Sequence, residues 1–221
     1  MGWTLRANVS FCISGERACF LDLDADRYFA LGTIADEAFR KLINGQQLNR
    51  WQSEALAPHI GSGLLQMCAG DTLPAPCPTA QAPTSDRHAI TGIRTNPLTL
   101  ARSGAQIFTA ERQLRTRPLG EILAEISDTR GSSEVLSAQD IEQRISSVCR
   151  AFECWDLLSS PLDRCLPRSI AMMRMLAPCR PQLVLGVMSR PFRAHCWVQL
   201  GGLVLNDALA HVSAFTPIRI I

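Results

Sequence analysis

A proline-rich stretch between residues 71 and 87 limits how this chain folds. Its sequence, DTLPAPCPTAQAPTSDR, spreads four prolines among Ala, Thr and Ser. Such a stretch neither propagates a helix nor pairs as a central strand. The whole chain has 221 residues, 47% of them apolar, which is enough for one large core or two small ones. We therefore expect two domains, residues 1–70 and 88–221, joined by a linker at residues 71–87.

The absence of long apolar runs argues against a membrane-spanning protein, and the weak net charge argues against a nucleic-acid-binding protein. The longest apolar runs fall far below the roughly 18–20 residues of a membrane-spanning helix. The opening residues, MGWTLRANVSFCIS, lack the pattern of a signal peptide. We therefore expect a cytoplasmic protein with no membrane span. A net charge of only +2 does not provide the basic surface that nucleic-acid binding requires.

Nine cysteines are scattered along the chain without the spacing of a disulfide framework. In the cytoplasm they stay reduced, and most should be small buried apolar side chains. The two cysteines closest in sequence are Cys149 and Cys154, and the four histidines lie far apart. Because zinc sites combine Cys-x-x-Cys pairs or clusters of His and Cys, we expect no metal site.

The first 70 residues change from a strand pattern to a helix pattern. Apolar residues alternate in three short segments separated by turns, as in antiparallel strands. From Thr33 the apolar period becomes helical, and Gly45 stands where a residue after the helix C-terminus belongs. The predicted strands are Val9–Ser14, Ala18–Asp24 and Tyr28–Leu31, and the predicted helices begin at Thr33, Arg50 and Ser62, the last two reaching about Pro58 and Ala69.

The remainder of the chain is predicted as helices followed by strands. The helical segments are Leu98–Thr116, Pro118–Ile126 and Ala138–Leu158, the last behind Ser137 as N-cap. The strand segments are Gln182–Met188, Ala194–Leu200 and Leu203–Asp207, with Gly201 and Gly202 between the last two. The sequence therefore predicts an α+β protein.

Cys165 is a candidate nucleophile. In SSPLDRCLPRSIAMMRML a helix should begin near Cys165, because Pro167 is tolerated only in a first turn and apolar residues then recur at helical spacing. Helix-terminal amides and the neighbouring Arg164 and Arg168 favour the reactive thiolate. A buried, inert thiol is the common alternative for any one cysteine, so a partner base is needed.

His195 and Asp207 are the candidate partners of that thiol. A two-residue turn at Gly201–Gly202 would pair residue 196 with residue 207 and place the two side chains on opposite sheet faces. A three-residue loop with a bulge would instead pair His195 with Asp207 on one face. We expect the three-residue loop, in which Asp207 orients the imidazole and His195 faces Cys165, as in a Cys-His-Asp triad.

These three motifs together resemble the transglutaminase-like cysteine proteases that remove leader peptides from lasso peptide precursors. The matching segments are CLPRS from Cys165, AHCWV from Ala194 and LND from Leu205, in the same order and at similar spacing. The resemblance implies a papain-like fold, with Cys165 as nucleophile, His195 as base and later acid, and Asp207 as orienting carboxylate. Cys196 stands where the family more often has a small apolar residue. It should point away from His195, and we expect no catalytic role for it.

The N-terminal segment FLDLDADRYFAL, followed by a helix, is similar to the small winged-helix-like PqqD domain that recognises peptide precursors. The resemblance implies that the leader adds a strand to the third strand, beside the third helix. The residues it maps onto are Tyr28, Phe29, Ala30, Leu31, Leu64, Leu65 and Met67. These residues also suit a small core, and both roles are compatible. A winged-helix DNA reader is disfavoured, because six Lys and Arg against seven Asp and Glu give this segment a net charge of −1.

The two resemblances imply a cytoplasmic leader peptidase for lasso peptide biosynthesis. Its partners would be a precursor peptide and an asparagine-synthetase-like cyclase that uses ATP. The chain itself has no G-x-x-x-x-G-K-[ST] loop and needs no cofactor of its own. Two alternatives stay open: an acyl-transferring transglutaminase with the same triad, and a non-catalytic peptide-binding module.

The other histidines and several arginines have weaker signals. His59, His88 and His211 have no partner spacing, and His88 and His211 are expected at the surface. Arg164, Arg168, Arg190 and Arg193 flank the candidate site in sequence and are expected to steer an acidic leader, to hold a carboxylate or to be solvated. The backbone amide of Cys165 is the one oxyanion donor that the sequence identifies.

Overall fold

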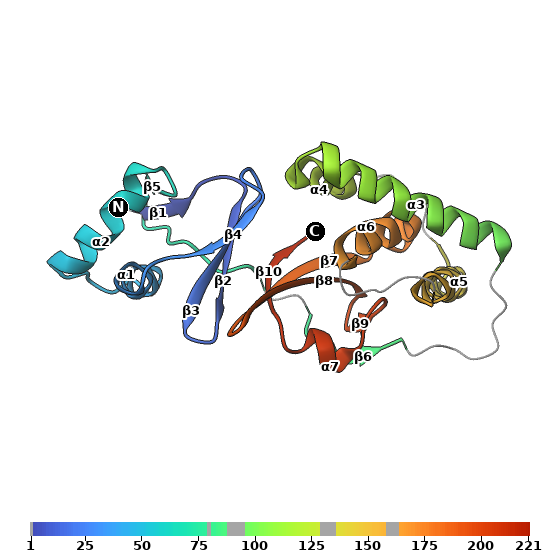
Figure 1. Ribbon diagram of the computed structural model, residues 1–221. Helices are drawn as coiled ribbons and strands as arrows, with labels where there is room; N and C mark the ends of the chain where they lie inside the picture. Colours follow the sequence, from blue (N-terminus) through green and yellow to red (C-terminus); the bar gives the residue numbers. More distant parts are fainter. Residues whose placement is uncertain (1, 79–80, 88–95, 129–135, 158–163) are drawn as a thin grey trace.

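The computed structural model describes residues 2–78, 81–87, 96–128, 136–157 and 164–221 (Figure 1). The N-terminal part holds β1 (Gly2–Leu5), β2 (Val9–Ser14), β3 (Arg17–Asp22), β4 (Arg27–Ala30), α1 (Thr33–Ile43), α2 (Arg50–Gly61) and β5 (Leu65–Cys68). The rest holds β6 (Ser85–Asp86), α3 (Pro97–Thr116), α4 (Leu119–Asp128), α5 (Ala138–Asp156), α6 (Cys165–Met175), a 3-10 turn (Ala177–Cys179), β7 (Gln182–Ser189), β8 (Phe192–Leu200), β9 (Leu203–Val204), α7 (Leu209–Val212) and β10 (Thr216–Ile220). The expected α+β class is confirmed. No helix among the described residues has the length and apolarity to cross a membrane.

Strands β2, β3 and β4 form an antiparallel sheet in that order, as the alternating pattern predicts. One face of this sheet carries aromatic rings that pack against α1. Phe20 stacks on Phe29 with ring centroids 5.0 Å apart, and Phe39 of α1 meets Phe20 edge-on at the same distance. Buried aromatic pairs of this kind contribute more than their area alone. The sheet is therefore anchored to the helices through its aromatic face.

The helix predicted from Ser62 to Ala69 is wrong. Leu65–Cys68 is strand β5, which pairs antiparallel with β1, so that Gly2 lies opposite Cys68. Gly63 adopts φ +76°, a left-handed conformation that separates this strand from α2. Between residues 2 and 70, which the structure describes without a gap, there are thus two helices and five strands, not three of each.

The C-terminal part is built on a five-stranded sheet in the order β10-β7-β8-β9-β6. Helices α3 to α6 lie on one side of it and the short α7 on the other (Figure 1). Helix α6 packs directly on β8 and is enclosed by α3 and α5. Its residues Ile170, Ala171 and Met172 are completely buried. This central position fixes the start of α6 against the sheet.

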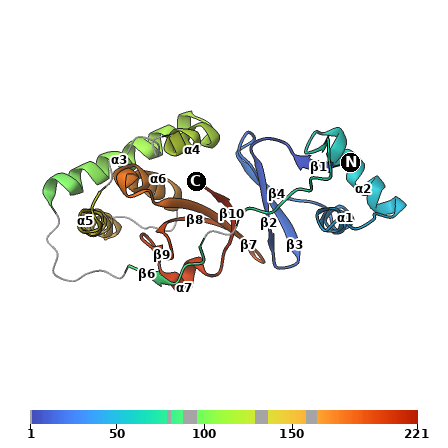
Figure 2. The ribbon, with the colours of Figure 1, turned by 180° about the vertical axis from the view of Figure 1, so that it is seen from behind.

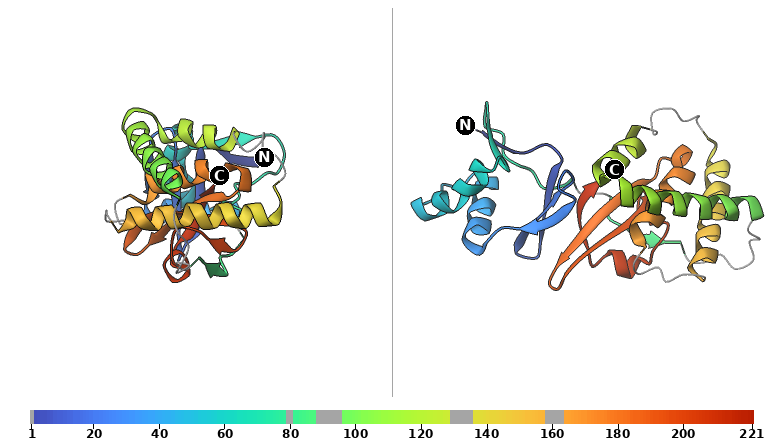
Figure 3. Two further views of the ribbon diagram at one scale, coloured as in Figure 1. Left: turned by 90° about the vertical axis from the view of Figure 1, so that its right-hand side faces the viewer. Right: turned by 45° about the horizontal axis from the view of Figure 1, so that its top comes forward.

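The two sheets share one core. The face of the N-terminal sheet that points away from α1 contributes Cys12, Cys19, Leu21 and Leu23 to the cluster that also contains Leu185 and Ile218. Strand β10 contacts both β2 and β3. The right-hand view of Figure 3 shows the blue N-terminal strands beside the orange strands of the C-terminal sheet. Truncating the chain between the two parts would therefore expose apolar surface on both.

The proline-rich stretch is packed along this junction where the structure describes it (Figure 2). The Trp3 amide donates to the Thr72 carbonyl at 2.7 Å, and the Cys77 amide donates to the Phe11 carbonyl at 2.8 Å. Further on, β6 pairs in parallel with β9. The division into domains at residues 71–87 stays a prediction.

The shared core predicts a large stability effect at Leu21, whose side chain is 1% exposed. Leu21→Ala should lower the free energy of unfolding by about 2–5 kcal/mol, because it removes buried methyl groups and leaves a cavity. Urea unfolding followed by both fluorescence and circular dichroism should show one coincident transition. Leu98→Ala, at a side chain 62% exposed, is the control and should change little. Equal effects of the two substitutions, or two separate transitions, would contradict the shared core.

Candidate active site

Cys165 is the first residue of α6, where the sequence pattern places it. Pro167 lies in the first turn, and the Arg168 amide donates to the Arg164 carbonyl at 3.2 Å. No side chain caps this helix. The backbone N–H groups of a first turn have no acceptor inside the helix and carry partial positive charge. The thiol of Cys165, which is half-buried, therefore lies in a field that favours its deprotonated form.

The β8–β9 turn differs from the expected loop. Leu200 pairs with Leu203 and Gln199 with Val204, which makes a two-residue turn at Gly201–Gly202. The expected three-residue loop is therefore wrong. We also expected a two-residue turn to place His195 and Asp207 on opposite sheet faces and so to prevent their contact, and this expectation is wrong as well. His195 Nε2 lies 2.5 Å from Asp207 Oδ2.

Asn206 explains how Asp207 reaches His195. The Leu205 amide still donates to the Val198 carbonyl at 2.9 Å, as the ladder requires. At the next position the side chain of Asn206 replaces the backbone, because its Oδ1 accepts from the Val198 amide at 2.8 Å. Its Nδ2 donates to Ser169 Oγ on α6, also at 2.8 Å. The backbone thus leaves the strand after Leu205 and turns the Asp207 carboxylate back toward His195.

The free edge of β8 receives Cys165. Val198 directs both its N–H and its C=O toward the β9 side, and in a strand the residue two positions earlier directs its backbone groups the same way. The β9 ladder is too short to pair with Cys196. The Cys196 carbonyl instead accepts a hydrogen bond from Ser169 Oγ at 3.4 Å, and the Cys196 amide donates to the Cys165 thiol. Cys165 is therefore held at the sheet edge, in contact with His195.

The electrostatics of this cluster favour a thiolate–imidazolium pair. Hydrogen bonds from the Cys196 thiol and from His195 lower the pKa of Cys165 to about 4 despite its burial. Burial opposes the charged form of His195, but hydrogen bonds to Asp207 and Cys165 raise its pKa to about 9. Burial also opposes ionisation of Asp207, and bonds from His195 and His211 still lower its pKa. At pH values between the pKa of Cys165, about 4, and that of His195, about 9, Cys165 carries a negative charge and His195 a positive one.

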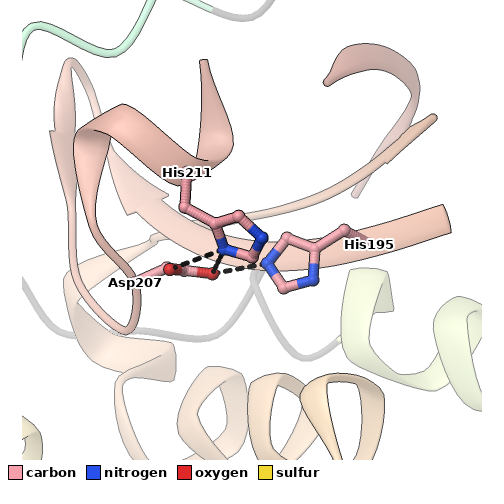
Figure 4. A group of neighbouring side chains, drawn as sticks. All are labelled: His195, Asp207 and His211. Carbon is pink, nitrogen blue, oxygen red and sulfur yellow. Dashed lines mark hydrogen bonds and ion pairs between the residues drawn. The ribbon is translucent and has the colours of Figure 1, made fainter. Parts of the chain in front are cut away.

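The sequence analysis placed His211 at the surface without a partner; it is half-buried, and the expectation that it has no partner is wrong. It lies on α7, and its Nδ1 is 3.0 and 3.1 Å from the two oxygens of Asp207 (Figure 4). Because a carboxylate only accepts hydrogen bonds, Nδ1 carries the proton. The i, i+4 spacing between Asp207 and His211 was the available signal. Asp86 of β6 holds α7 in place by accepting from the Leu209 amide at 2.6 Å.

These side chains surround a cavity of about 210 Å³. Its lining includes Cys165, His195, Cys196, Asp207, His211 and Phe215. The rings of Phe215 and His195 lie 5.1 Å apart. Gly186, the β7 partner of His195, leaves room for the Trp197 ring, which a Cβ there would approach to 2.7 Å. The imidazole is therefore packed against the rings of Phe215 and Trp197.

The three side chains His195, Asp207 and His211 also form the one group of metal-ligating type among the described residues. Their ligand atoms lie within 4.8 Å of one another. Two ligands on a tetrahedral zinc ion lie roughly 3.3 Å apart, as follows from Zn–N distances of 2.0–2.1 Å. The 2.5 Å between His195 Nε2 and Asp207 Oδ2 is a hydrogen-bond distance. The N–H group at Nδ1 of His211 already donates to Asp207. The arrangement fits a hydrogen-bonded dyad better than a metal centre.

The flanking arginines have different environments. Arg168 lines the cavity and pairs with Asp156, and it also donates to the Asn206 carbonyl. Arg193 lines the cavity as well. Arg164 lies 3.4 Å from Glu111 on α3, and Arg190 is exposed at the β7–β8 turn. Arg193 is thus the arginine best placed to meet a bound ligand. Of the remaining histidines, His59 lies on α2 and is half-buried, and His88 lies outside the described residues.

The residues proposed for leader binding are divided between surface and core. Tyr28, Phe29 and Ala30 lie on β4, the edge strand of its sheet, whose outer backbone groups have no strand partner within the described chain. Leu31, Leu64 and Leu65 are buried together in the N-terminal core, at 2, 7 and 1% exposure. Met67 is 65% exposed on β5. Ala30 and Met67 are thus exposed, Tyr28 and Phe29 are half-buried, and the three leucines are core residues.

Comparison with known families agrees with this geometry. The profile of the Transglutaminase-like superfamily matches residues 105–220, which is more than half of the chain and includes the Cys165, His195 and Asp207 motifs. The chain therefore belongs to the transglutaminase-like superfamily. Comparisons with curated proteins and with solved structures gave no match.

Proposed function

We propose that this protein is a cysteine peptidase that removes the leader from a ribosomally made lasso peptide precursor. The observation that carries the proposal is the contact of Cys165 with His195, whose Nε2 lies 2.5 Å from Asp207. A thiolate beside an oriented imidazolium is the arrangement that nucleophilic acyl transfer requires. The superfamily match and the three sequence motifs support the same reaction class.

The geometry supports a two-step hydrolysis. The Cys165 thiolate adds to the carbonyl carbon at the junction of leader and core, and the oxyanion that forms lies near the first N–H groups of α6. His195 donates its proton to the departing amine, which leaves with the core, and a thioester to the leader remains. His195 then takes a proton from water, the hydroxide attacks the thioester, and the leader carboxylate departs as the Cys165 thiolate re-forms.

Leader recognition is proposed for the edge of β4. The unpaired edge offers backbone donors and acceptors to an extended peptide. Tyr28 on this strand packs against Phe192, with ring centroids 5.9 Å apart, and Phe192 precedes His195 on β8 by three residues. Burial raises the pKa of the Tyr28 hydroxyl, and electrostatic interaction with Cys196 and Cys165 raises it further. The recognition strand thus lies within electrostatic range of the nucleophile.

The proposal includes a partner, an asparagine-synthetase-like cyclase that uses ATP to close the core peptide into a ring. The amine released by His195-assisted cleavage would be the group that the cyclase joins to a side-chain carboxylate. This element depends on the family resemblance, and no P-loop motif in the chain supplies ATP binding of its own.

The test is to incubate the full-length protein with the precursor peptide encoded beside it, with and without the cyclase and ATP, and to follow the peptide by mass spectrometry. Without the cyclase, the proposal expects two fragments whose masses add up to that of the precursor plus one water. With cyclase and ATP, ring closure removes one water from the core fragment. A precursor that stays intact even with cyclase and ATP would overturn it.

The second candidate function is transglutaminase-type acyl transfer, which the superfamily match favours equally. The thioester would then react with an amine in place of water. Adding a biotinylated primary amine to the same incubation separates the two reactions. Hydrolysis leaves a free carboxylate on the leader fragment, whereas acyl transfer leaves the biotin on it.

His211 is expected to act as a positioning residue through Asp207. His211→Leu removes a hydrogen bond to a carboxylate, an interaction of about 1.5–3 kcal/mol, and should lower kcat by about tenfold or more. His211→Asn keeps an N–H donor near the position of Nδ1 and should recover most of the rate. Steady-state kinetics of both variants check this. If both variants behave alike, or only KM changes, His211 does not act through Asp207.

A further inference from the structure

Cys196 contacts Cys165 but takes no part in the bond-making and bond-breaking steps of the proposed peptidase. Its side chain points into the core, on the face opposite His195, and is 3% exposed. Its thiol nevertheless donates a hydrogen bond to Cys165, and both residues line the same cavity. The contact has a geometric cause, because the first turn of α6 is fixed to the backbone of Cys196 through Ser169 and through Cys165 itself. Two thiols that are 31 positions apart are thereby held side by side.

The two sulfur atoms differ in reactivity. Cys165 is half-buried and opens to the cavity, and its low pKa keeps it a thiolate. The hydrogen bond to Cys165, together with burial, raises the pKa of Cys196. Peroxides oxidise accessible thiolates first, and a neighbouring thiol then resolves the product. Cys165 therefore has the properties of the attacking thiol and Cys196 those of the resolving thiol.

We propose that Cys165 and Cys196 form a redox modification site that takes hydrogen peroxide or an organic hydroperoxide as oxidant. The Cys165 thiolate attacks one peroxide oxygen, the O–O bond breaks, and a sulfenic acid forms while the other oxygen leaves as water or alcohol. The Cys196 sulfur then attacks Cys165, the S–O bond breaks, and water leaves with the proton of Cys196. Two thiols and one hydrogen peroxide thus become one disulfide and two waters.

A second thiol pair in the chain supplies a contrast. Cys12 and Cys19 lie directly opposite each other on β2 and β3. Both are buried, and burial raises the pKa of each, that of Cys12 to about 12. Proximity without a thiolate and without access does not make a peroxide site. The distinguishing feature of the Cys165–Cys196 pair is that one member faces the cavity as an anion.

The disulfide would switch the enzyme off reversibly. It occupies the nucleophile, and it also prevents oxidation of Cys165 to sulfinic and sulfonic acids, which thiols do not reverse. A cytoplasmic thiol reductant would restore the free pair. This consequence depends on the proposed peptidase function, but disulfide formation itself requires only the two thiols and their contact.

The test treats the full-length protein with a small excess of hydrogen peroxide, blocks remaining thiols with iodoacetamide, and maps the modified peptides by mass spectrometry. The wild-type protein should yield one cross-linked product that joins the peptides of Cys165 and Cys196, and dithiothreitol should reverse it. In Cys196→Ser the same treatment should drive Cys165 to sulfinic acid, which dithiothreitol does not reverse. Cys19→Ser is the matched control and should form the cross-link as the wild type does.

Three results would overturn the proposal. They are sulfinic Cys165 with free Cys196 in the wild-type protein, a cross-link from Cys165 to another cysteine, and equal reversibility in wild type and Cys196→Ser. If the serine variant does not fold, as judged by its thermal unfolding, the wild-type cross-link map decides alone. Because the readout is a mass and not an activity, failure of the peptidase proposal and failure of this one are separate outcomes.

Discussion

Cys165→Ala is expected to abolish cleavage of the precursor, with a loss in kcat of about 10⁴-fold or more. In the proposed mechanism Cys165 supplies the electron pair that forms the thioester, and the neighbouring Cys196, at 3% exposure in the core, offers no substitute. The helix N-terminus and the cavity remain in the variant, so peptide binding should persist. Mass spectrometry of the precursor measures the first effect, and fluorescence anisotropy of a labelled precursor measures the second.

The matched control for this experiment is Cys68→Ala, which removes another half-buried thiol, on β5, away from the cavity. It should cleave at the wild-type rate. If Cys165→Ala and the control cleave equally well, Cys165 is a structural thiol and the protein is a binding module or uses another nucleophile.

Asp207→Asn is the second substitution with a large expected effect. An amide at this position has no charge to balance the imidazolium, and its NH₂ group competes with the donors from His195, His211 and the Ala208 amide. In Ser-His-Asp triads the same exchange lowers kcat by about 10⁴-fold, and a loss of up to that size is expected here.

The pH dependence gives this prediction a second readout. Asp207 helps to raise the pKa of His195 to about 9, so the pair loses its imidazolium as the pH rises through that value. Without the carboxylate the pKa of His195 falls, and the alkaline limb of the profile of kcat/KM against pH should move to lower pH. An alkaline limb that stays in place in Asp207→Asn would mean that Asp207 does not stabilise the charged imidazole.

Local patterns were sufficient for most elements, because they depend on residues that are close in sequence. The alternation from Val9 to Ser14 predicts β2, and Ser137 as N-cap predicts the start of α5, where its side chain accepts from the Asp140 amide. Strands β1 and β5 were missed, since each is defined by a partner strand 60 to 66 residues away. A short strand without its own alternation gives no local signal.

The candidate site shows the same division between local and distant causes. The start of α6 at Cys165 follows from Pro167 and the helical period after it. The approach of Asp207 to His195 does not follow from turn length, because the side chain of Asn206 takes over a backbone hydrogen bond and bends the chain. The Cys165–Cys196 contact depends on how α6 packs against the edge of β8, and no residue spacing in the sequence predicts that packing.

The central claim, that Cys165 and His195 form an ion pair, is tested most directly by the pH dependence of alkylation. Iodoacetamide should modify Cys165 selectively at about pH 6, where an ordinary thiol of pKa ~8.5 is almost fully protonated. The buried Cys12 and Cys149, whose pKa values burial raises to about 12, are internal controls and should not react. In wild type the reaction should fade only as the pH falls toward 4, and in His195→Ala that acidic limb should move to higher pH. If Cys165 reacts no faster than Cys68, or if His195→Ala leaves the profile unchanged, the ion pair does not exist.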